Sequence, residues 1–321
     1  MITLSKIAKL AHVSVSTASK AFSMSNEVNE QTREEIFAIA KQYGCFKKYF
    51  NAKYPKYVVA IICPEFKSRY YSHILSYLQR NLEAHNCEIC VASTNFSPET
   101  EKELLEYYSK YATVDGVIVV DGRLETDIGI EVPVIAINSE TTNNTIISFT
   151  SDFKSSLEEA INYFIKNGVT NIGFIGEKYT DIKLETYKDI MNKLTGNVCE
   201  EYISISDKRF EEGGYDAMQA LIDSKNIPRA LICAYDNLAI GAMRCIFENG
   251  LCVPDDVAVL GIDNIRESKY VNPPLSSIST RAKDLCEAAA LAVIGMLTNK
   301  SFEANKTFKS KLFLRESTKI K

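Results

Sequence analysis

The chain has 321 residues, a length typical of about two domains. Hydrophobic residues make up 46% and charged residues 24% of it, a globular balance that excludes a mainly disordered chain. Its apolar runs stay well below the roughly 20 residues that a membrane helix needs, and its start does not resemble a secretory signal. The nine cysteines, an odd number spread over a long chain, predict reduced thiols in a cytoplasmic protein.

Charge is unevenly distributed along the chain. Residues 1–56 carry nine Lys and Arg against four Glu, a net charge of +5, whereas the rest of the chain carries a net charge of −9. A basic head on an acidic body is typical of a protein whose head alone contacts a polyanion, although chance clustering explains the charges equally well.

Residues 1–45 predict three short helices. The first has one apolar face, formed by Leu4, Ile7, Ala8 and Ala11. Ser14 is a good N-cap for a second helix over residues 15–22, and Asn29 caps a third that ends at Gly44. The three-residue turn 12–14 between the first two helices indicates a helix-turn-helix domain.

The second helix is the candidate for recognising DNA bases. Its exposed residues would be Val15, which can contact a thymine methyl group, Ser16, and Lys20, which can reach guanine acceptors. Short hydroxyl donors that suit phosphate oxygens are also present, at Ser14, Thr17 and Ser19. The alternative is a three-helix interaction domain in which these hydroxyls only cap helices.

The segment Thr3–Lys20 resembles the opening of the lac repressor (LacI/GalR) family of bacterial transcription regulators. The segments Val28–Arg33 and Ala40–Gly44 match the third helix of that pattern, and the similarity continues to the C-terminus. This resemblance implies that the head binds DNA. His12 departs from the pattern because the family usually has glycine there, and histidine tolerates a positive φ at some cost.

Residues 46–56 form the expected hinge linker. In the family this segment carries a short helix whose leucine wedges into the minor groove. Here the linker is shorter, and Tyr54 stands where the leucine should be, directly before Pro55. Because proline disfavours helix in the preceding residue, either Tyr54 or a neighbouring Phe is the wedge, or no standard hinge helix forms. A simple solvated tether is the remaining alternative.

Residues 57–321 alternate short apolar strands with amphipathic helices. We expect strands at 57–63, 87–92, 115–120, 133–137, 171–176, 200–205, 229–233 and 257–261. This alternation predicts an α/β fold with parallel sheets covered by helices. The resemblance implies a periplasmic-binding-protein-like body, with one lobe of about 57–150 and 280–308 and a second of about 151–279 and 309–321. Three crossovers are expected, near residues 150, 280 and 308.

The resemblance also implies a ligand site in the cleft between these lobes. A sugar needs carboxylates and amides for its hydroxyls and an aromatic platform for its ring. Asp263 follows a predicted strand and corresponds to a family ligand contact, and Tyr70 and Tyr71 occupy a paired-aromatic position of the family, with core packing as their alternative. The weaker candidates are Arg123, Asp152, which also suits an N-cap, and Asp236.

Two residues depart from the family pattern at this cleft. Lys183 stands where the family usually has arginine, and it supplies charge without a planar fork for two hydroxyls. Tyr235 stands where a small polar residue is usual, and its ring can either stack on a sugar or fill the sugar's place. Both are kept as candidate effector contacts.

We therefore predict a cytoplasmic, homodimeric transcriptional regulator, a repressor by preference, whose partners are double-stranded operator DNA and a sugar effector. The chain stops three residues after Thr318, without a leucine-heptad tail for tetramers, which favours a dimer. We expect no catalytic residues, no metal, no cofactor and no membrane contact. The alternatives are a purine or protein co-repressor in the same DNA-binding role, or a sugar-binding module that does not bind DNA.

Overall fold

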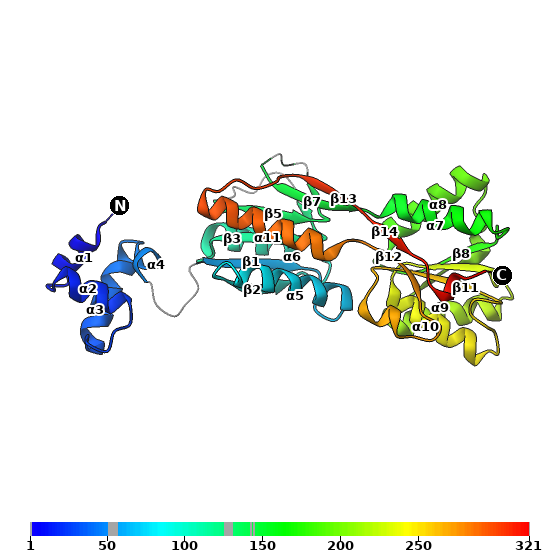
Figure 1. The fold of residues 1–321 in the computed structure, drawn as a ribbon, viewed down its shortest axis with the longest axis horizontal. Helices are drawn as coiled ribbons and strands as arrows, with labels where there is room; N and C mark the ends of the chain where they lie inside the picture. The colour runs from blue at the N-terminus through cyan, green and yellow to red at the C-terminus, as the bar shows by residue number, and fades with distance from the viewer. Residues whose placement is uncertain (1, 51–56, 125–130, 142, 144, 321) are drawn as a thin grey trace.

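A computed structural model describes residues 2–50, 57–124, 131–141, 143 and 145–320 of the chain. It has a small helical head followed by a body of two α/β lobes (Figure 1). The predicted wedge residue Tyr54 lies outside the described residues. Among the helices that the structure describes, none is long and apolar enough to cross a membrane.

The head forms the helices that its capping residues predict. They are α1 (Leu4–Leu10), α2 (Val15–Phe22), α3 (Glu30–Gln42) and the short α4 (Phe46–Tyr49). Ser14 Oγ accepts the Thr17 N–H at 2.9 Å, and Asn29 Oδ1 accepts the Thr32 N–H at 2.8 Å. His12 has a φ of 52°, so the positive φ anticipated at this turn is confirmed.

The packing of the head extends beyond its expected boundary at residue 45. Phe46 and Phe50 stack with ring centroids 4.8 Å apart, and both contact Phe37. Phe22 lies beneath this group, and the Tyr49 hydroxyl donates to the Ile2 carbonyl at 2.9 Å. Phe46 and Phe50 are therefore part of the head's aromatic core, which argues against the alternative in which a Phe near Tyr54 is the minor-groove wedge.

The first lobe has a six-stranded parallel sheet in the order β13-β7-β5-β3-β1-β2. Its strands are β1 (Tyr57–Cys63), β2 (Cys87–Ser93), β3 (Gly116–Val120), β5 (Val134–Ile137), β7 (Ile147–Asp152) and β13 (Lys306–Lys309). Helices α5 (Arg69–Glu83) and α11 (Ala282–Thr298) share one apolar core with the sheet, and α6 (Pro98–Glu106) shares another. The short strands β4 (Arg123–Leu124) and β6 (Glu140–Thr141) pair with each other.

The second lobe has another six-stranded sheet, in the order β14-β12-β11-β10-β8-β9. Its strands are β8 (Ile172–Glu177), β9 (Ile203–Ser206), β10 (Ala230–Cys233), β11 (Ala258–Ile262), β12 (Ser276–Ser279) and the antiparallel β14 (Lys311–Phe313). Its helices are α7 (Phe153–Lys166), α8 (Asp181–Thr195), α9 (Phe210–Asp223) and α10 (Asp236–Glu248). Helices α9 and α10 can approach closely because Gly214 and Gly241 have no Cβ. A Cβ at either position would collide with the backbone of the other helix.

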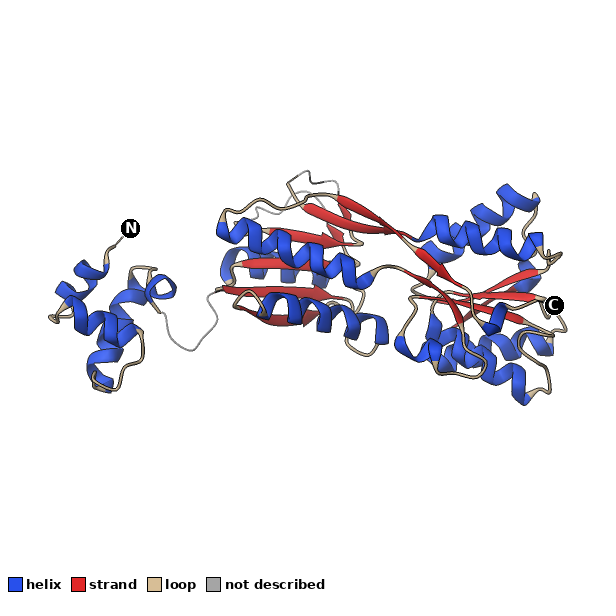
Figure 2. Ribbon diagram, in the orientation of Figure 1, coloured by secondary structure: helices blue, strands red, loops and turns tan. Residues whose placement is uncertain are grey.

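The chain passes between the lobes at three places (Figure 2). Strand β7 of the first sheet leads into α7 of the second lobe at Asp152. Strand β12 of the second sheet leads back into α11, and Ser310 separates β13 of the first sheet from β14 of the second. All eight strands predicted from apolar runs are present, and the three crossovers expected near 150, 280 and 308 are confirmed at the ends of β7, β12 and β13.

Candidate functional site

Helix α2 presents an open face on the head. Ala18, Ala21 and Phe22 are buried, as predicted, whereas Val15 is 47% exposed and Ser16 and Ser19 are exposed. These exposed residues lie on the side of α2 that a DNA major groove can approach, because the opposite side is packed against the head core.

Two of the predicted phosphate donors already have partners. The hydroxyls of Ser14 and Thr17 lie 2.8 Å apart, and Ser14 also caps α2. The ammonium of Lys20 pairs with Glu27, so DNA would have to displace that carboxylate. The structure thus leaves Val15, Ser16 and Ser19 open and gives Ser14, Thr17 and Lys20 intramolecular contacts.

The first-lobe wall of the cleft begins at the N-terminus of α5. Tyr70 and Tyr71 lie edge to face with centroids 5.3 Å apart. The Asn138 Nδ2 donates to the Tyr70 hydroxyl at 3.1 Å, and the Tyr71 hydroxyl hydrogen-bonds to the carboxylate of Asp121. Asp121 and Asn138 directly follow β3 and β5, and neither was predicted as a site residue. Both satisfy the same strand-end rule that selected Asp263.

Lys183 is the centre of the second-lobe wall. Its Nζ donates to the Ala234 carbonyl at 2.8 Å and lies 3.6 Å from Oδ1 of Asp263. The same ammonium lies 6.0 Å from the ring centroid of Tyr235, whose hydroxyl accepts the Phe210 N–H at 3.0 Å. Tyr235 is therefore anchored in its own lobe and occupies part of the space between the strand ends and α9.

Three polar residues at strand ends have left-handed backbone conformations. Asp121 has a φ of 49°, Asn138 of 48° and Asp263 of 98°. Such conformations are uncommon for residues other than glycine, cost free energy and concentrate at functional sites. Their recurrence after β3, β5 and β11 indicates that the strand ends hold these side chains in set positions.

Burial changes the acidity of these groups. Burial raises the pKa of Asp121 to about 7, although the hydrogen bond from Tyr71 and the charge of Lys183 oppose the rise. Burial also raises the pKa of Asp263, against the opposing charge of Lys183. A ligand that donates hydrogen bonds to these carboxylates would favour their ionised forms.

Three predicted contacts are not brought into this group. Asp236 is fully buried, and its oxygens accept from the Ile265 N–H and from the hydroxyls of Ser268 and Ser277 at 2.5–2.8 Å. Asp152 caps α7 by accepting the Ser155 N–H at 3.1 Å. Arg123 is exposed on β4, and its backbone N–H donates to Glu101 Oε1 at 2.8 Å. Asp236 is thus hydrogen-bonded within its own lobe, and its predicted effector contact stays a prediction.

A second group of side chains, also missed from sequence, joins the two lobes. Phe96 follows β2 and Tyr179 follows β8, and their rings stack 4.0 Å apart at an interplanar angle of 9°. Arg209, directly before α9, reaches Glu65 of the first lobe at 2.7 Å and Glu177 of its own lobe at 3.3 Å. Apart from Glu177, the last residue of β8, these residues lie in loops without periodicity, so only their shared position at or after the ends of sheet strands could have signalled them.

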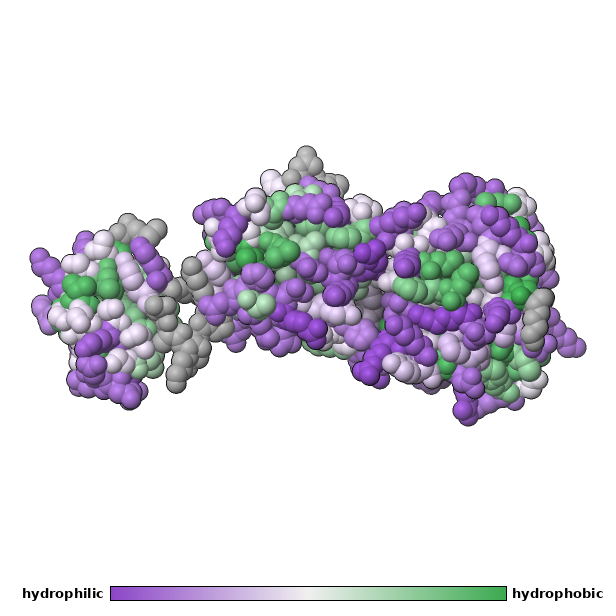
Figure 3. Space-filling view, viewed as in Figure 1, coloured by the Kyte–Doolittle hydropathy of each residue, from purple (hydrophilic) through white to green (hydrophobic). Residues whose placement is uncertain are grey.

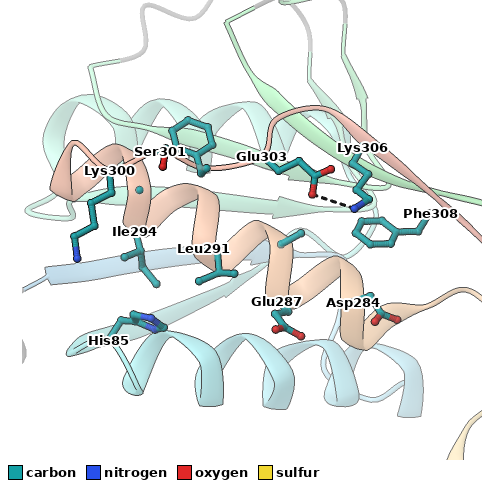
Figure 4. A pocket seen from close by; sticks show the side chains of 13 residues that line it. His85, Asp284, Glu287, Leu291, Ile294, Lys300, Ser301, Glu303, Lys306 and Phe308 are labelled. Atoms are coloured by element: carbon teal, nitrogen blue, oxygen red, sulfur yellow. Dashed lines mark hydrogen bonds and ion pairs between the residues drawn. The ribbon is translucent and has the colours of Figure 1, made fainter.

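Two of the grooves formed by the described residues are similar in size. One, of about 450 Å³, lies between the lobes and is lined by Tyr70 and Asp263 together with residues of α5, α11 and β14. The other, of about 470 Å³, lies on the first lobe between α11 and the segment that leads to β13 (Figure 4). Hydrophobic residues gather over α11 on the face seen in Figure 3, but the lining of this second groove includes none of the predicted effector contacts. The inter-lobe groove has a size typical of small-molecule sites, and its lining includes Tyr70 and Asp263 but neither Lys183 nor Tyr235.

The described residues contain no group of three or more His, Cys, Asp or Glu side chains placed to hold a metal ion. A helix-turn-helix head on a two-lobed α/β body with a cleft defines a DNA-binding protein with a ligand site. Residues 3–45 match the bacterial regulatory proteins of the lacI family, and residues 161–318 match the periplasmic binding protein-like domain.

Curated relatives extend this similarity over the whole chain. The HTH-type transcriptional regulator GalR of Streptococcus thermophilus is 30% identical over 99% of this chain and 100% of its own length. The probable HTH-type transcriptional repressor ExuR of Bacillus subtilis (strain 168) is 28% identical over 98% of this chain and 97% of its own. The chain therefore belongs to the lacI family and is a DNA-binding transcriptional regulator.

Solved structures show the same architecture. The Escherichia coli transcriptional repressor ascG is 25% identical, with a TM-score of 0.72 over 81% of this chain and 98% of that chain. The lac repressor dimer bound to operator and the anti-inducer ONPF has a TM-score of 0.73 and 19% identity, covering 99% of both chains. At that identity the lac repressor comparison supports the fold alone.

Proposed function

We propose that this protein is a cytoplasmic, homodimeric repressor whose operator affinity is set by a sugar bound between the two lobes. The observation that carries the proposal is the meeting of Lys183 and Asp263 with Tyr70 and Asp121 across the cleft, in a chain that has a helix-turn-helix head. The proposed role is regulation and not catalysis.

The polar groups of the cleft suit a polyhydroxylated ligand. The carboxylates of Asp121 and Asp263 can accept hydrogen bonds from hydroxyl groups, and Asn138 and Lys183 supply hydrogen-bond donors. The hydroxyl of Ser151, next to the Asn138 contact, is buried without a partner among the described residues. Tyr70 offers an apolar ring at the groove. Sugars combine hydroxyls with apolar ring faces, so this mixture supports a sugar over a flat, fully apolar effector.

The head supports operator binding by a pair of subunits. One helix-turn-helix contacts a short half-site, and two heads on a dimer read two half-sites of a pseudo-palindrome about one helical turn apart. Residues 1–56 have a net charge of +5, which favours contacts with phosphates. Val15, Ser16, Ser19 and Lys20 are the proposed recognition surface, with Ser14 and Thr17 at its edge.

A ligand screen tests the effector half of the proposal. The full-length protein would be melted with monosaccharides, disaccharides, sugar phosphates and purines, since a ligand that binds only the native state raises the melting temperature. We expect a selective rise with one sugar, and loss of that rise in Lys183→Ala and Asp263→Ala. A selective rise with a purine would contradict the sugar assignment and keep the regulatory one.

Matched controls separate the cleft from general damage. Lys154 and Asp189 form an exposed ion pair in the same lobe at 3.8 Å, so Lys154→Ala and Asp189→Ala should keep the sugar response. Operator binding would be measured by selecting sites from random DNA and repeating the gel shift with and without the sugar. Failure to enrich any pseudo-palindromic site would contradict operator binding by a dimer.

A further inference from the structure

Arg209 links the two lobes through a partly buried ion pair. Its guanidinium Nη1 donates to Glu65 Oε2 of the first lobe at 2.7 Å, and its Nε donates to Glu177 Oε1 of the second lobe at 3.3 Å. Glu177 is 1% exposed and Glu65 is 8% exposed. Opposite charges held by charged hydrogen bonds in a buried place interact more strongly than exposed pairs.

Aromatic rings enclose this charged group. The guanidinium carbon of Arg209 lies 4.9 Å from the ring centroid of Phe96, 5.3 Å from that of Tyr179 and 4.6 Å from that of Phe210. Phe96 comes from the first lobe, and the other two come from the second. The stack of Phe96 on Tyr179 therefore covers the same boundary that the Arg209–Glu65 ion pair crosses.

The link is continuous with the proposed effector site. Phe96 contacts Tyr71 with centroids 6.4 Å apart, and Phe210 contacts Tyr235 at 6.2 Å. A row of rings thus runs from the first-lobe wall, through Arg209, to the second-lobe wall. The protein's own side chains make all of these contacts.

We propose that Arg209, Glu65 and the Phe96–Tyr179 stack form an inter-lobe latch that holds the lobes closed before any effector binds. The inference concerns regulation of the cleft, and its biological meaning rests on the proposed function. A sugar then reaches Lys183 and Asp263 only after the latch opens, so effector binding selects a minor open state.

The second carboxylate oxygen of Glu65 favours opening of the lobes. Oε1 of Glu65 is buried and has no hydrogen-bond partner among the described residues, whereas its Oε2 binds Arg209. An unpartnered carboxylate oxygen is costly when buried and gains water when the lobes separate. The closed arrangement therefore depends on Arg209, because without it both Glu65 and Glu177 would be buried charges lacking their cation.

A fluorescence reporter tests the latch without an effector. The chain has no tryptophan, so Tyr179→Trp introduces a single indole at the boundary, stacked on Phe96. In this background we expect Arg209→Ala to shift the emission to longer wavelength, to increase acrylamide quenching and to enlarge the radius of gyration from X-ray scattering. Because removing one partner of a buried ion pair leaves the other charge uncompensated, the closed-to-open ratio should fall by at least about 100-fold.

The matched control is Arg244→Ala, which removes an exposed arginine of α10 whose partner is Glu248 in the same helix. It should leave the emission and the scattering unchanged. If Arg209→Ala also leaves both unchanged while the protein stays folded, the latch does not exist. This result would leave the sugar and operator experiments untouched, so failure of the latch is distinguishable from failure of the proposed function.

A charge swap covers the case in which Arg209→Ala does not fold. Glu65→Arg should open the lobes by placing two cations together. Combining it with Arg209→Glu restores opposite charges across the boundary, and adding Glu177→Gln removes the buried carboxylate that would repel the new one, so the triple variant should return the emission towards that of the parent. An Arg209 that only stabilised its own lobe would leave Glu65→Arg closed, and this result would overturn the proposal.

Discussion

The head and the cleft place their functional side chains in opposite ways. The DNA-facing residues of the head come from one short segment, Ser14 to Lys20, and remain on an open surface. The cleft takes its residues from α5, from the ends of β3, β5 and β11, and from α8, and most of them are partly buried and bonded to each other. Local rules therefore suffice for the head, whereas the cleft depends on the packing of two whole lobes.

The largest effect should come from breaking the support beneath the cleft. Asp236→Ala leaves the Ile265 N–H and the hydroxyls of Ser268 and Ser277 without their buried acceptor. We expect a loss of about 3 kcal/mol in the free energy of unfolding, measured by urea titration, because buried polar groups without partners are costly.

The comparison variant is Asp263→Ala, which removes the carboxylate from the cleft wall. Burial already raises the pKa of Asp263, and its ion pair with Lys183 is long, so we expect a change below about 1 kcal/mol together with loss of effector binding. Equal stability of both variants, with effector binding lost in Asp236→Ala alone, would make Asp236 a direct ligand contact after all.

A charge placed on the open face of α2 should separate the two regions. Ser16→Asp adds a carboxylate to an exposed residue that faces the proposed DNA surface. We expect operator affinity to fall at least about 100-fold, close to 2.7 kcal/mol, because phosphates repel the new charge. The measurement is a gel shift with the selected operator, and the effector-induced rise in melting temperature should not change.

The control for this variant is Gln42→Asp, which puts the same charge on the exposed end of α3. It should weaken operator binding less than tenfold. A similar loss in both variants would mean that the head contributes only its net charge, and that α2 does not read the DNA.

The capping residues show why the head could be predicted so closely. Ser14 and Asn29 each accept the N–H three residues further on, and this local bond determines where α2 and α3 begin. The cleft was only partly predictable. Asp263 was found by its position after a strand, but Asp121 and Asn138, which satisfy the same rule, were overlooked.

The contact between Arg209 and Glu65 could not be predicted from the sequence. They lie 144 positions apart in the chain and meet only because the two sheets face each other at their carboxyl ends. The hydrogen bonds of Asp236 could not be predicted for a related reason, since a strand-end position does not show whether a carboxylate points to the cleft or to Ser268 and Ser277.

The pH dependence of stability should distinguish the buried cleft from the open head. Asp121 has a pKa of about 7 in the folded protein, raised by burial, and an ordinary, lower pKa when unfolded. The folded state keeps the proton of Asp121 to higher pH than the unfolded state, so ionisation of this carboxyl disfavours folding. The contribution of protonated Asp121 to stability is therefore lost as pH rises from about 4 to 7. The groups facing Asp121 are Tyr70, Tyr71, Lys183, Asp263, Asn138, Cys63 and Cys286.

Asp121→Asn removes that ionisation while keeping the shape of the side chain. We expect the variant to gain about 2.5 kcal/mol in the free energy of unfolding over the parent at pH 8 relative to pH 5, which is roughly 5–10 °C in melting temperature. The difference would be followed by differential scanning calorimetry at both pH values. A difference that does not depend on pH would show that Asp121 is not the group responsible.

The smallest effect should come from the cap of α2, where structure and DNA contact compete for one hydroxyl. Ser14→Ala removes the acceptor for the Thr17 N–H and should cost about 1 kcal/mol within the head. Hydrogen exchange at Thr17 in the full-length protein should then accelerate about fivefold. Ser14→Thr keeps the acceptor and should restore most of the protection. If Ser14→Ala leaves this exchange unchanged but lowers operator affinity and the salt dependence of binding, then the main role of Ser14 is a phosphate contact and not the helix cap.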